Sequence, residues 1–288
     1  MPKDEASTHD AIIVTEIWRY PVKSMMGERL PETDLGENGI PGDRAWAVRD
    51  EKRGGIRGAK KIPQLMDMQA SSQDDAPLIT ARDGQSARAH DADIHSWLSE
   101  KLDHPVSLWP LVPAEQLEHY RRGAPDSDDP LEEFRNVMGR LPGETLPDFS
   151  DMPELLEFES PPGTYFDAFP ILLLSQQSLN TMNALYEESI FDVRRFRPNI
   201  LLDFTGSDAP FPEQSLIGKT VTIGTVELEI VSTCPRCSMT THAFADLPKD
   251  TKIMRRLVEK TDGNLGVYAT IKKAGQVKEA DRLSLQTG

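Results

Sequence analysis

Two cysteines, three positions apart, carry the most distinctive chemistry in this 288-residue chain. They lie in the segment Cys234-Pro-Arg-Cys237, at the end of a run of strand-forming residues. The spacing is compatible with a redox-active dithiol, half of a zinc site, one thiolate on a soft metal, or a buried structural pair. Spacing alone leaves all four hypotheses open.

The surroundings of the two cysteines argue against the first two hypotheses. A thioredoxin-like fold needs a helix directly after the motif, whereas Ser238-Met-Thr-Thr-His242 is poor in helix formers and the chain ends soon afterwards. A zinc site needs four ligands, but the chain has no other cysteine and only His242 nearby. Arg236 lies beside the thiols and is expected to lower a thiol pKa, which favours a thiolate on a metal.

A second cluster is rich in arginine and precedes an apolar run. The segment Arg194-Arg-Phe-Arg-Pro-Asn199 stands in a chain with 32 basic and 47 acidic residues, a formal net charge of −15. Arginine binds phosphate through a planar fork, and an asparagine amide both donates and accepts at the edge of a heterocycle. An anion site is therefore one interpretation of the cluster, and a solvated basic turn is the other. Lys23-Ser24 and Gly42-Asp-Arg44 place further basic side chains at strand–turn junctions.

The composition indicates a globular protein, with 38% hydrophobic and 27% charged residues. The longest purely apolar run, Ile171 to Leu174, is far too short to span a membrane. Residues 1–10 lack the basic start and apolar stretch of a secretory signal, so we interpret them as a flexible tail of a cytoplasmic protein. The net negative charge disfavours binding to nucleic acid and to anionic membranes.

Short strands dominate the predicted secondary structure. β-branched, aromatic and alternating residues predict strands at 12–20, 44–49, 169–174, 200–204 and 267–271, one within 277–285, and a hairpin of 220–223 with 226–231. Apolar spacing predicts helices at 93–103, after Ser175 and at 250–261. In the second of these helices we expect Leu179, Met182 and Leu185 to face inward. The expected fold class is α+β and mainly β: a β-barrel-like core, an N-terminal β-rich subdomain packed against it, and a few peripheral helices.

The composition also predicts domain boundaries. Residues 121–162 are acidic and proline-rich, which is typical of a long surface excursion or a linker. The chain then divides into a tail at 1–10, an N-terminal β-rich domain at 11–120, this excursion, and a second domain at 163–288. Within the first domain, residues 52–61 are basic and contain glycines, and predict a mobile loop.

Several motifs, in this order, carry a family resemblance. They are Ile17-Trp-Arg-Tyr-Pro-Val-Lys-Ser24, Gly39-Ile-Pro-Gly-Asp-Arg44, Phe166-Asp167, Leu172-Leu-Leu-Ser175, Arg195-Phe-Arg-Pro-Asn199, Ile217-Gly218, Cys234-Pro-Arg-Cys-Ser-Met-Thr-Thr241 and Gly266-Val-Tyr268. Together they resemble the MOSC family, the proteins with a molybdenum-cofactor-sulfurase C-terminal domain. The resemblance covers roughly residues 11–110 and 164–286. It is closest to members with an N-terminal β-barrel half, such as the mitochondrial amidoxime-reducing component and its bacterial relatives.

The resemblance implies a role for each matching residue. Cys237 would be the catalytic residue and the ligand of molybdenum, and the implied cofactor is the molybdenum-molybdopterin cofactor. Pyridoxal phosphate binding is attached to the family only as a family-level label. The implied contacts to the pterin cofactor are Lys23, Ser24, Arg44, Arg197 and Asn199, with Ser175 and Arg236 as further contacts.

The implied function is reduction of N-oxygenated small molecules at a cysteine-ligated oxo-molybdenum centre. The chain contains no ferredoxin-like set of cysteines, so electrons would come from a separate protein of the ferredoxin or cytochrome/flavin-reductase kind. The alternative is a carrier that passes on the cofactor, or sulfur held as a persulfide on Cys237, without redox turnover. A site that has lost its cofactor is a third hypothesis.

Two segments depart from the family pattern. Phe211-Pro-Glu-Gln-Ser-Leu216 lacks the aspartate and tryptophan of F-x-E-D-x-W, and His242-Ala-Phe-Ala-Asp-Leu247 replaces V-D-x-D-T-G. Because both segments belong to the expected rim of the site, the resemblance does not identify the substrate.

Overall fold

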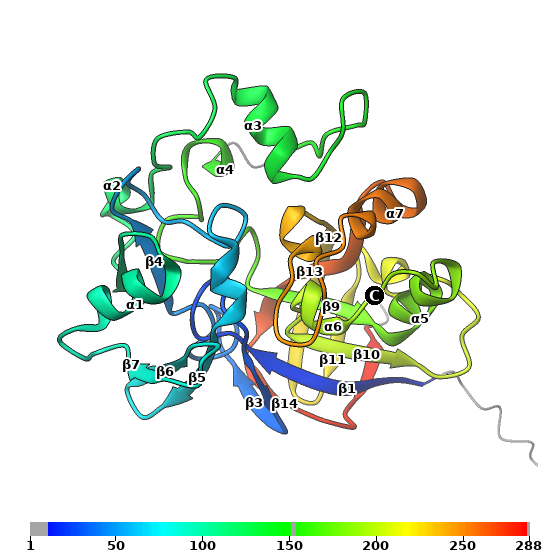
Figure 1. The fold of residues 1–288 in the computed structure, drawn as a ribbon. Helices are drawn as coiled ribbons and strands as arrows, with labels where there is room; N and C mark the ends of the chain where they lie inside the picture. Colours follow the sequence, from blue (N-terminus) through cyan, green and yellow to red (C-terminus); the bar gives the residue numbers. More distant parts are fainter. Residues whose placement is uncertain (1–10, 151–153, 287–288) are drawn as a thin grey trace, which may run out of the picture.

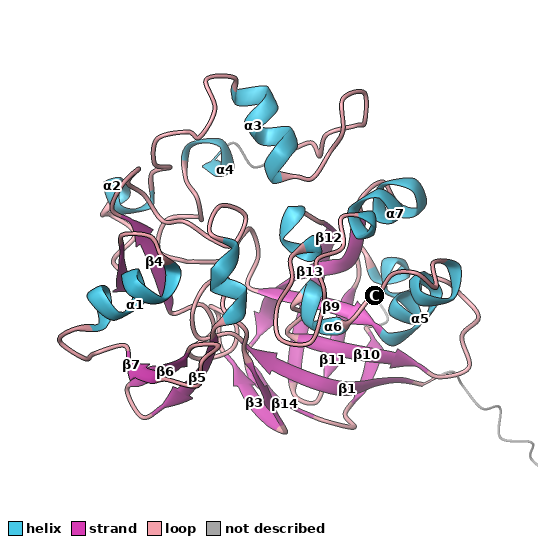
Figure 2. Ribbon diagram, in the orientation of Figure 1, coloured by secondary structure: helices cyan, strands magenta, loops and turns pink. Residues whose placement is uncertain are grey.

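Seven strands close into a barrel in the computed structural model, which describes residues 11–150 and 154–286 (Figures 1 and 2). The neighbouring strands around the barrel, beginning and ending beside the same strand, are β1 (Ile12–Arg19), β10 (Ile200–Phe204), β9 (Ile171–Ser175), β13 (Asn264–Lys273), β12 (Val226–Pro235), β11 (Thr220–Ile223) and β15 (Arg282–Leu285). The short β2 (Glu28–Leu30) also pairs with β1. The predicted class, α+β with a barrel-like β core, is confirmed.

Alternation of apolar and polar residues marks β11 and the first half of β12, whereas β9 is apolar and buried along its whole length. In β12, Val226, Leu228 and Ile230 are buried, whereas Glu227 and Glu229 are only partly covered. This period of two is the pattern of a strand with one face in a core. The inward residues of the strands form one hydrophobic cluster inside the barrel.

The barrel is closed by a strand from the N-terminal part of the chain. β1 pairs with β10 in antiparallel register, with Ile17 opposite Ile200 and Ile12 opposite Phe204, and on its other side it pairs with β15. The first strand of the predicted N-terminal domain is thus a barrel strand. The rest of that domain meets the barrel at the end of β1.

The remaining N-terminal residues form a second unit around a separate hydrophobic cluster. Its elements are β4 (Trp46–Asp50), the 3-10 helix η1 (Pro63–Asp67), β5 (Gln69–Gln73), β6 (Ala76–Thr80), β7 (Ser86–Arg88), α1 (Ile94–Leu102) and β8 (Val106–Pro110). β4 pairs with β8, and β5, β6 and β7 form a small sheet. β3 (Glu32–Leu35) pairs with β14 (Gly275–Lys278), near the end of the chain, and Leu35 and Val277 of this pair belong to the barrel cluster.

Helices lie outside the barrel strands (Figure 2). They are α5 (Gln176–Leu185), α6 (Val193–Phe196), η2 (Pro212–Leu216), η3 (Ser238–Thr241) and α7 (Lys252–Thr261). As predicted, the Ser175 side chain caps α5, where it accepts a hydrogen bond from the Ser178 amide. α1 and α7 also confirm predicted helices. None of the helices in residues 11–150 and 154–286 has the length and apolar character needed to cross a membrane.

One inward prediction is wrong. Leu179 and Met182 of α5 are buried, but Leu185 is 49% exposed. A spacing of three residues falls short of the 3.6-residue turn, so each step rotates by about 60° and the second step leaves the buried face. The next residue, Tyr186, packs instead against the hydrophobic cluster that contains Leu179 and Met182.

The segment predicted as a surface excursion contains local structure. α2 (Leu117–Tyr120) precedes it, and α3 (Pro130–Val137) and α4 (Glu154–Glu157) lie within it. Asp129 caps α3 by accepting hydrogen bonds from the amides of Leu131 and Glu132. In Figure 1, α3 lies at the top of the view, with the N-terminal unit below it on one side and α7 on the other.

The two leucines of α5 give a matched test of this packing. Leu179→Ala should lower the free energy of unfolding by about 2–5 kcal/mol, because it removes a buried side chain and leaves a cavity. Leu185→Ala should change it by less than about 0.5 kcal/mol, as is usual for an exposed position. Urea denaturation of both variants measures the difference. Equal losses of stability would contradict the observed orientation of α5.

Candidate cofactor site

A cavity of about 1180 Å³ lies where the N-terminal unit, the barrel and the 121–150 segment meet. Five of the residues predicted for the site line it: Arg44, Arg197, Asn199, Arg236 and Cys237. The fold therefore brings predicted residues from three distant parts of the chain to one cavity. The cavity lining does not include Lys23, Ser24 or Ser175.

The pairing of β1 with β10 places the first two of these parts, the turn of Arg44 and the turn of Arg197 and Asn199, side by side. Just beyond the paired strands, the Trp18 amide donates to the Asn199 carbonyl at 2.8 Å. Asp43 then joins the two segments: its carboxylate accepts from the Tyr20 amide at 2.7 Å and from Asn199 Nδ2 at 3.0 Å. The Arg44 amide donates to the Tyr20 carbonyl at 2.7 Å. Strand pairing thus determines the distance between the two arginine-bearing turns.

Two guanidinium groups lie over the ring of Tyr20. Arg197 Cζ is 4.1 Å and Arg44 Cζ is 4.8 Å from the ring centroid, within the range of cation–π attraction. Arg44 forms an ion pair with the fully buried carboxylate of Asp43 and donates to Asn199 Oδ1 at 3.2 Å. Tyr20 and Asp43, which sequence reasoning did not select, are therefore the platform and the counter-charge of this pair.

Arg197 differs from Arg44 in lacking an acidic partner. Its guanidinium donates to the Met25 carbonyl, and within the described residues no carboxylate forms an ion pair with it. Burial, and then the like charge of Arg44, lower the pKa of Arg197 to about 10. A buried cation without a counter-ion is unfavourable, so this position favours an anionic ligand.

Three predicted contacts share an unusual backbone conformation. Ser24, Arg44 and Arg197 have φ angles of 70°, 47° and 54°, in the left-handed region that non-glycine residues rarely occupy. Such strain tends to gather at functional sites, where surrounding structure holds it in place. Arg197, for example, adopts this conformation at the end of α6.

Lys23 lies behind the cavity wall and acts through Asp167. Its buried amino group donates to Asp167 Oδ1 and to the Tyr165 carbonyl, each at 2.9 Å, and Lys60 approaches the same carboxylate at 3.3 Å. Although burial favours the neutral acid, the positive charges of Lys23 and Lys60 hold the pKa of Asp167 well below its usual range. Asp167, a simple turn residue by sequence, is therefore an ionised group in the cavity wall.

Ser24 positions residues 52–61, here called the basic loop. Its hydroxyl oxygen accepts from the Ala59 amide at 2.9 Å, and His242 Nε2 lies 3.0 Å from the Ala59 carbonyl. The loop then presents Arg57, Lys60 and Lys61 to the cavity. Ser24 therefore does not line the cavity but holds the loop whose basic side chains do.

Ser175 lies outside the cavity. Its fully buried hydroxyl donates to Glu213 Oε2 at 2.5 Å and accepts from the Ser178 amide at 3.0 Å. Glu213 also accepts from the Ser178 hydroxyl, and burial raises the pKa of the Glu213 carboxyl. The proposed cofactor contact of Ser175 is not found here, because this hydroxyl caps α5 and binds Glu213.

The two cysteines have different environments. Cys234 is 2% exposed, and its sulfur accepts from Arg236 Nη1 at 2.8 Å. Both cysteines line the cavity, but Cys237, just before η3 begins, is partly exposed. Burial raises the pKa of the Cys234 thiol and outweighs the opposing charge of Arg236. Arg236 does act to lower the pKa of the Cys234 thiol, as expected, but burial has the larger effect, so the charge of Arg236 does not make Cys234 a favoured thiolate.

The charges around the cavity suit an anion. Its lining contains eight basic residues, namely Arg44, Arg57, Lys60, Lys61, Arg122, Arg195, Arg197 and Arg236, and five acidic ones, namely Glu133, Asp148, Glu159, Asp167 and Asp262. This excess opposes the net charge of −15. Local positive charge in an acidic protein is consistent with a site for phosphate or another anion.

A protein-only metal site is not found. Within the described ranges, no three His, Cys, Asp or Glu side chains gather so as to hold a metal ion. A metal bound at Cys237 would need its other ligands from a cofactor. One accessible thiol beside unpaired arginines fits a soft metal that arrives with an anionic organic ligand.

Comparison with known proteins agrees with this donor set. Residues 161–284 match the MOSC domain, and residues 11–110 match the MOSC N-terminal beta barrel domain. The chain belongs to the MOSC family. Residues 111–160 lie between the two matched ranges.

Curated MOSC relatives include two kinds of protein. Mitochondrial amidoxime reducing component 2 from Bos taurus is 26% identical over 292 residues, which cover 93% of this chain and 81% of the relative. The Homo sapiens protein of the same name is 26% identical over 298 residues, covering 93% and 82%. A molybdenum cofactor sulfurase from Aspergillus terreus is 24% identical over 324 residues, covering 88% of this chain and 38% of the sulfurase. Both names refer to proteins related to the molybdenum cofactor or to amidoxime reduction.

The two thiols of this MOSC protein should react differently. In protein purified without cofactor, Cys237 should react quickly with a thiol reagent, whereas Cys234 should react only on unfolding, because it is buried and its thiol pKa is raised. Mass spectrometry after brief iodoacetamide treatment identifies the labelled residue. Rapid labelling in Cys237→Ala would contradict the assignment of Cys237 as the accessible thiol.

Arg197 gives a second test of the site. Inorganic phosphate or pyrophosphate should raise the melting temperature of cofactor-free protein, because an anion that binds only the folded state stabilises it. Arg197→Met should lose most of this rise, and its melting temperature without phosphate should not fall below that of the wild type, since a buried unpaired charge is removed. Arg29→Met, at an exposed ion pair away from the cavity, is the control. An unchanged phosphate effect in Arg197→Met would contradict the anion site.

Proposed function

We propose that this protein binds the molybdenum cofactor and reduces N-oxygenated small molecules with electrons from a separate protein. The observation that carries the proposal is the placement of Cys237, a partly exposed thiol in a cavity with two buried arginines, Arg197 and Arg236, that have no carboxylate partner among the described residues. The names of the curated relatives describe components that reduce amidoximes, which supports reduction of an N–O bond as the reaction.

Each part of the cavity has a role in this proposal. The Cys237 thiolate would ligate molybdenum, and Arg44, Arg197, Asn199 and Arg236 would hold the phosphate and pterin of the cofactor. When bound, the cofactor supplies the two-electron redox chemistry. The protein binds and orients: Asp43 and Tyr20 keep the two arginines in place, and the fixed charges need no reorganisation during the reaction.

The reaction is balanced by two electrons and two protons. Reduction of a hydroxylamine or an amidoxime breaks the N–O bond, forms an N–H bond and releases water. Asp167 is held ionised by Lys23 and Lys60, so its part is to position these two lysines.

Metal content provides the decisive test. The protein should be expressed in a host that makes the molybdenum cofactor, and molybdenum and pterin should be measured in wild type, Cys237→Ala and Cys234→Ala. Wild type and Cys234→Ala should contain both at near one per chain, whereas Cys237→Ala should lose most of the molybdenum. The wild type should reduce benzamidoxime when a chemical electron donor is supplied.

Other outcomes identify the alternatives. Undiminished molybdenum in Cys237→Ala would refute the ligand assignment. Cyanide-labile sulfur on Cys237 without turnover would show a carrier of cofactor or sulfur. Absence of metal from wild type under cofactor-replete conditions would refute the proposed function.

A further inference from the structure

The residues between the two matched domains form one wall of the cavity. Residues 124–149, here called the wall segment, include α3 and the loop that follows it. The family matches end at 110 and resume at 161, so this wall is built by residues outside both matched ranges. The apolar side chains of the wall segment that line the cavity include Phe134, Val137, Met138, Leu146, Pro147 and Phe149.

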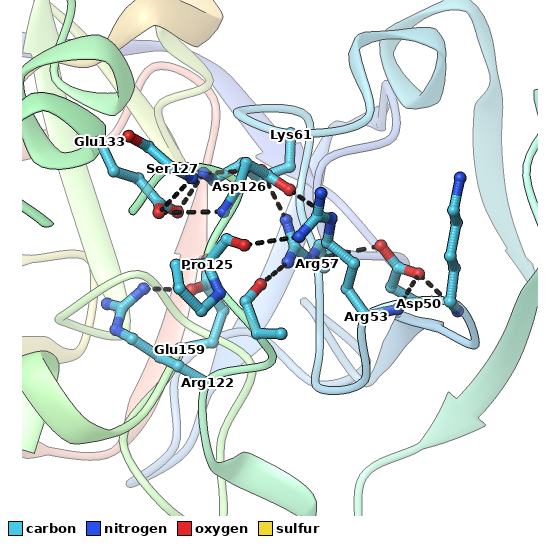
Figure 3. A network of polar contacts seen from close by, with 12 residues as sticks. Asp50, Arg53, Arg57, Lys61, Arg122, Pro125, Asp126, Ser127, Glu133 and Glu159 are labelled. Atoms are coloured by element: carbon cyan, nitrogen blue, oxygen red, sulfur yellow. Dashed lines mark hydrogen bonds and ion pairs between the residues drawn. The ribbon is translucent and has the colours of Figure 1, made fainter. Parts of the chain in front are cut away.

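The first part of the wall segment is bound to the basic loop by ion pairs (Figure 3). Asp126 lies between three cations, at 2.8 Å from each of Arg53 Nε, Arg57 Nη1 and Lys61 Nζ. Glu133 of α3 also pairs with Lys61, and its other oxygen accepts from the Asp126 amide at 3.0 Å. Because Arg57 and Lys61 line the cavity, these contacts place α3 along its edge.

The second part of the wall segment is bound to the MOSC domain. Arg255 of α7 pairs with Glu144 and donates to the Gly139 carbonyl. Gly139 has a φ of 62°, and a side chain there would lie 3.5 Å from the backbone of Ser238, the residue after Cys237. The wall segment therefore extends along the cavity from the basic loop to the residues around Cys237, here called the cysteine loop.

Two phenylalanines of the wall segment are held in place but not fully covered. Phe134 and Phe149 pack edge to face with their ring centroids 6.0 Å apart, and both remain partly exposed at the cavity. By contrast, the arginine pair and Asn199 belong to the barrel side of the same cavity. One cavity thus has a polar, cationic face for an anion and a separate apolar face. Binding sites commonly combine such an apolar lining with a few polar groups that orient the ligand.

We propose that the wall segment selects the substrate by binding its apolar substituent, an aryl or branched alkyl group, while the N–O group faces Cys237. This inference rests on the proposed function. It follows from the position of the wall segment beside the cysteine loop and from its partly exposed phenylalanines. A substrate without such a substituent makes no use of this wall.

Two substrates that share a reactive group separate the wall from the reaction. Benzamidoxime carries a phenyl ring and acetamidoxime a methyl group. In cofactor-loaded protein, Phe134→Ala should lower kcat/KM for benzamidoxime about tenfold or more, mainly through KM, because the lost apolar contact is of the size that discriminates substrates. The value for acetamidoxime should stay within about twofold, with unchanged molybdenum content.

Leu131 offers a matched control on the same helix. It is 54% exposed and does not line the cavity, so Leu131→Ala should leave both substrates unaffected. Phe134→Leu, which keeps an apolar side chain, should recover part of the preference for benzamidoxime. Equal losses for both substrates in Phe134→Ala, or the same loss in Leu131→Ala, would overturn the proposal.

A binding measurement distinguishes failure of this proposal from failure of the reductase function. Calorimetric titration of benzamidoxime into wild type, Phe134→Ala and Cys237→Ala requires no turnover. We expect binding in wild type and Cys237→Ala and at least tenfold weaker binding in Phe134→Ala. If the protein shows this binding pattern but no reduction, the proposed reductase function is refuted, whereas the proposal that the wall segment binds the apolar substituent stands. Equal affinity in wild type and Phe134→Ala would refute the wall whatever the activity.

Discussion

The antiparallel pairing of β1 with β10 is the constraint on which the site depends. It closes the barrel and aligns Ile17 with Ile200, and the ladder continues as the Trp18 amide bonds to the Asn199 carbonyl. The chain leaves β1 at the end where it enters β10, so Tyr20 and the turn that carries Arg44 meet the turn before β10. A shift of one residue in this register would reverse the faces of β1, which would expose its core side chains and separate the two arginines.

The second constraint is electrostatic. Arg44 and Arg197 share the face of Tyr20, but the one buried carboxylate near them, Asp43, pairs directly with Arg44. Arg236 has its guanidinium on the Cys234 sulfur and the Phe196 carbonyl instead of a carboxylate. Unpaired buried charge lowers folding stability, and an anionic ligand would offset that cost. An anion bound beside Arg197 would therefore stabilise the folded protein.

Sequence patterns predicted the parts of this molecule that depend on local periodicity or on a motif. The barrel strands follow from alternation, and Arg44, Arg197, Asn199, Arg236 and Cys237 do line one cavity. Prediction was less successful where a residue acts through a distant partner. Lys23 reaches the cavity only through Asp167, and the Ser175 hydroxyl is bound to Glu213, far along the chain. Neither contact leaves a signal in residue spacing. Similarly, Arg236 could be placed near a thiol, but the burial that dominates the pKa of Cys234 is a property of the folded protein.

The construction of the cavity separates two tasks. Its cationic face is made by turns that the closed barrel positions, with Asp43 and Tyr20 holding Arg44 and Arg197 in place. Its apolar face is made by a segment joined to the rest through ion pairs, many with exposed partners, such as Asp126 with 40% of its side chain exposed. Such pairs contribute only about 0–1 kcal/mol each. Side chains on this face can therefore change with little effect on the barrel, which makes the wall segment the part of the site where specificity can vary independently of the anion-binding face.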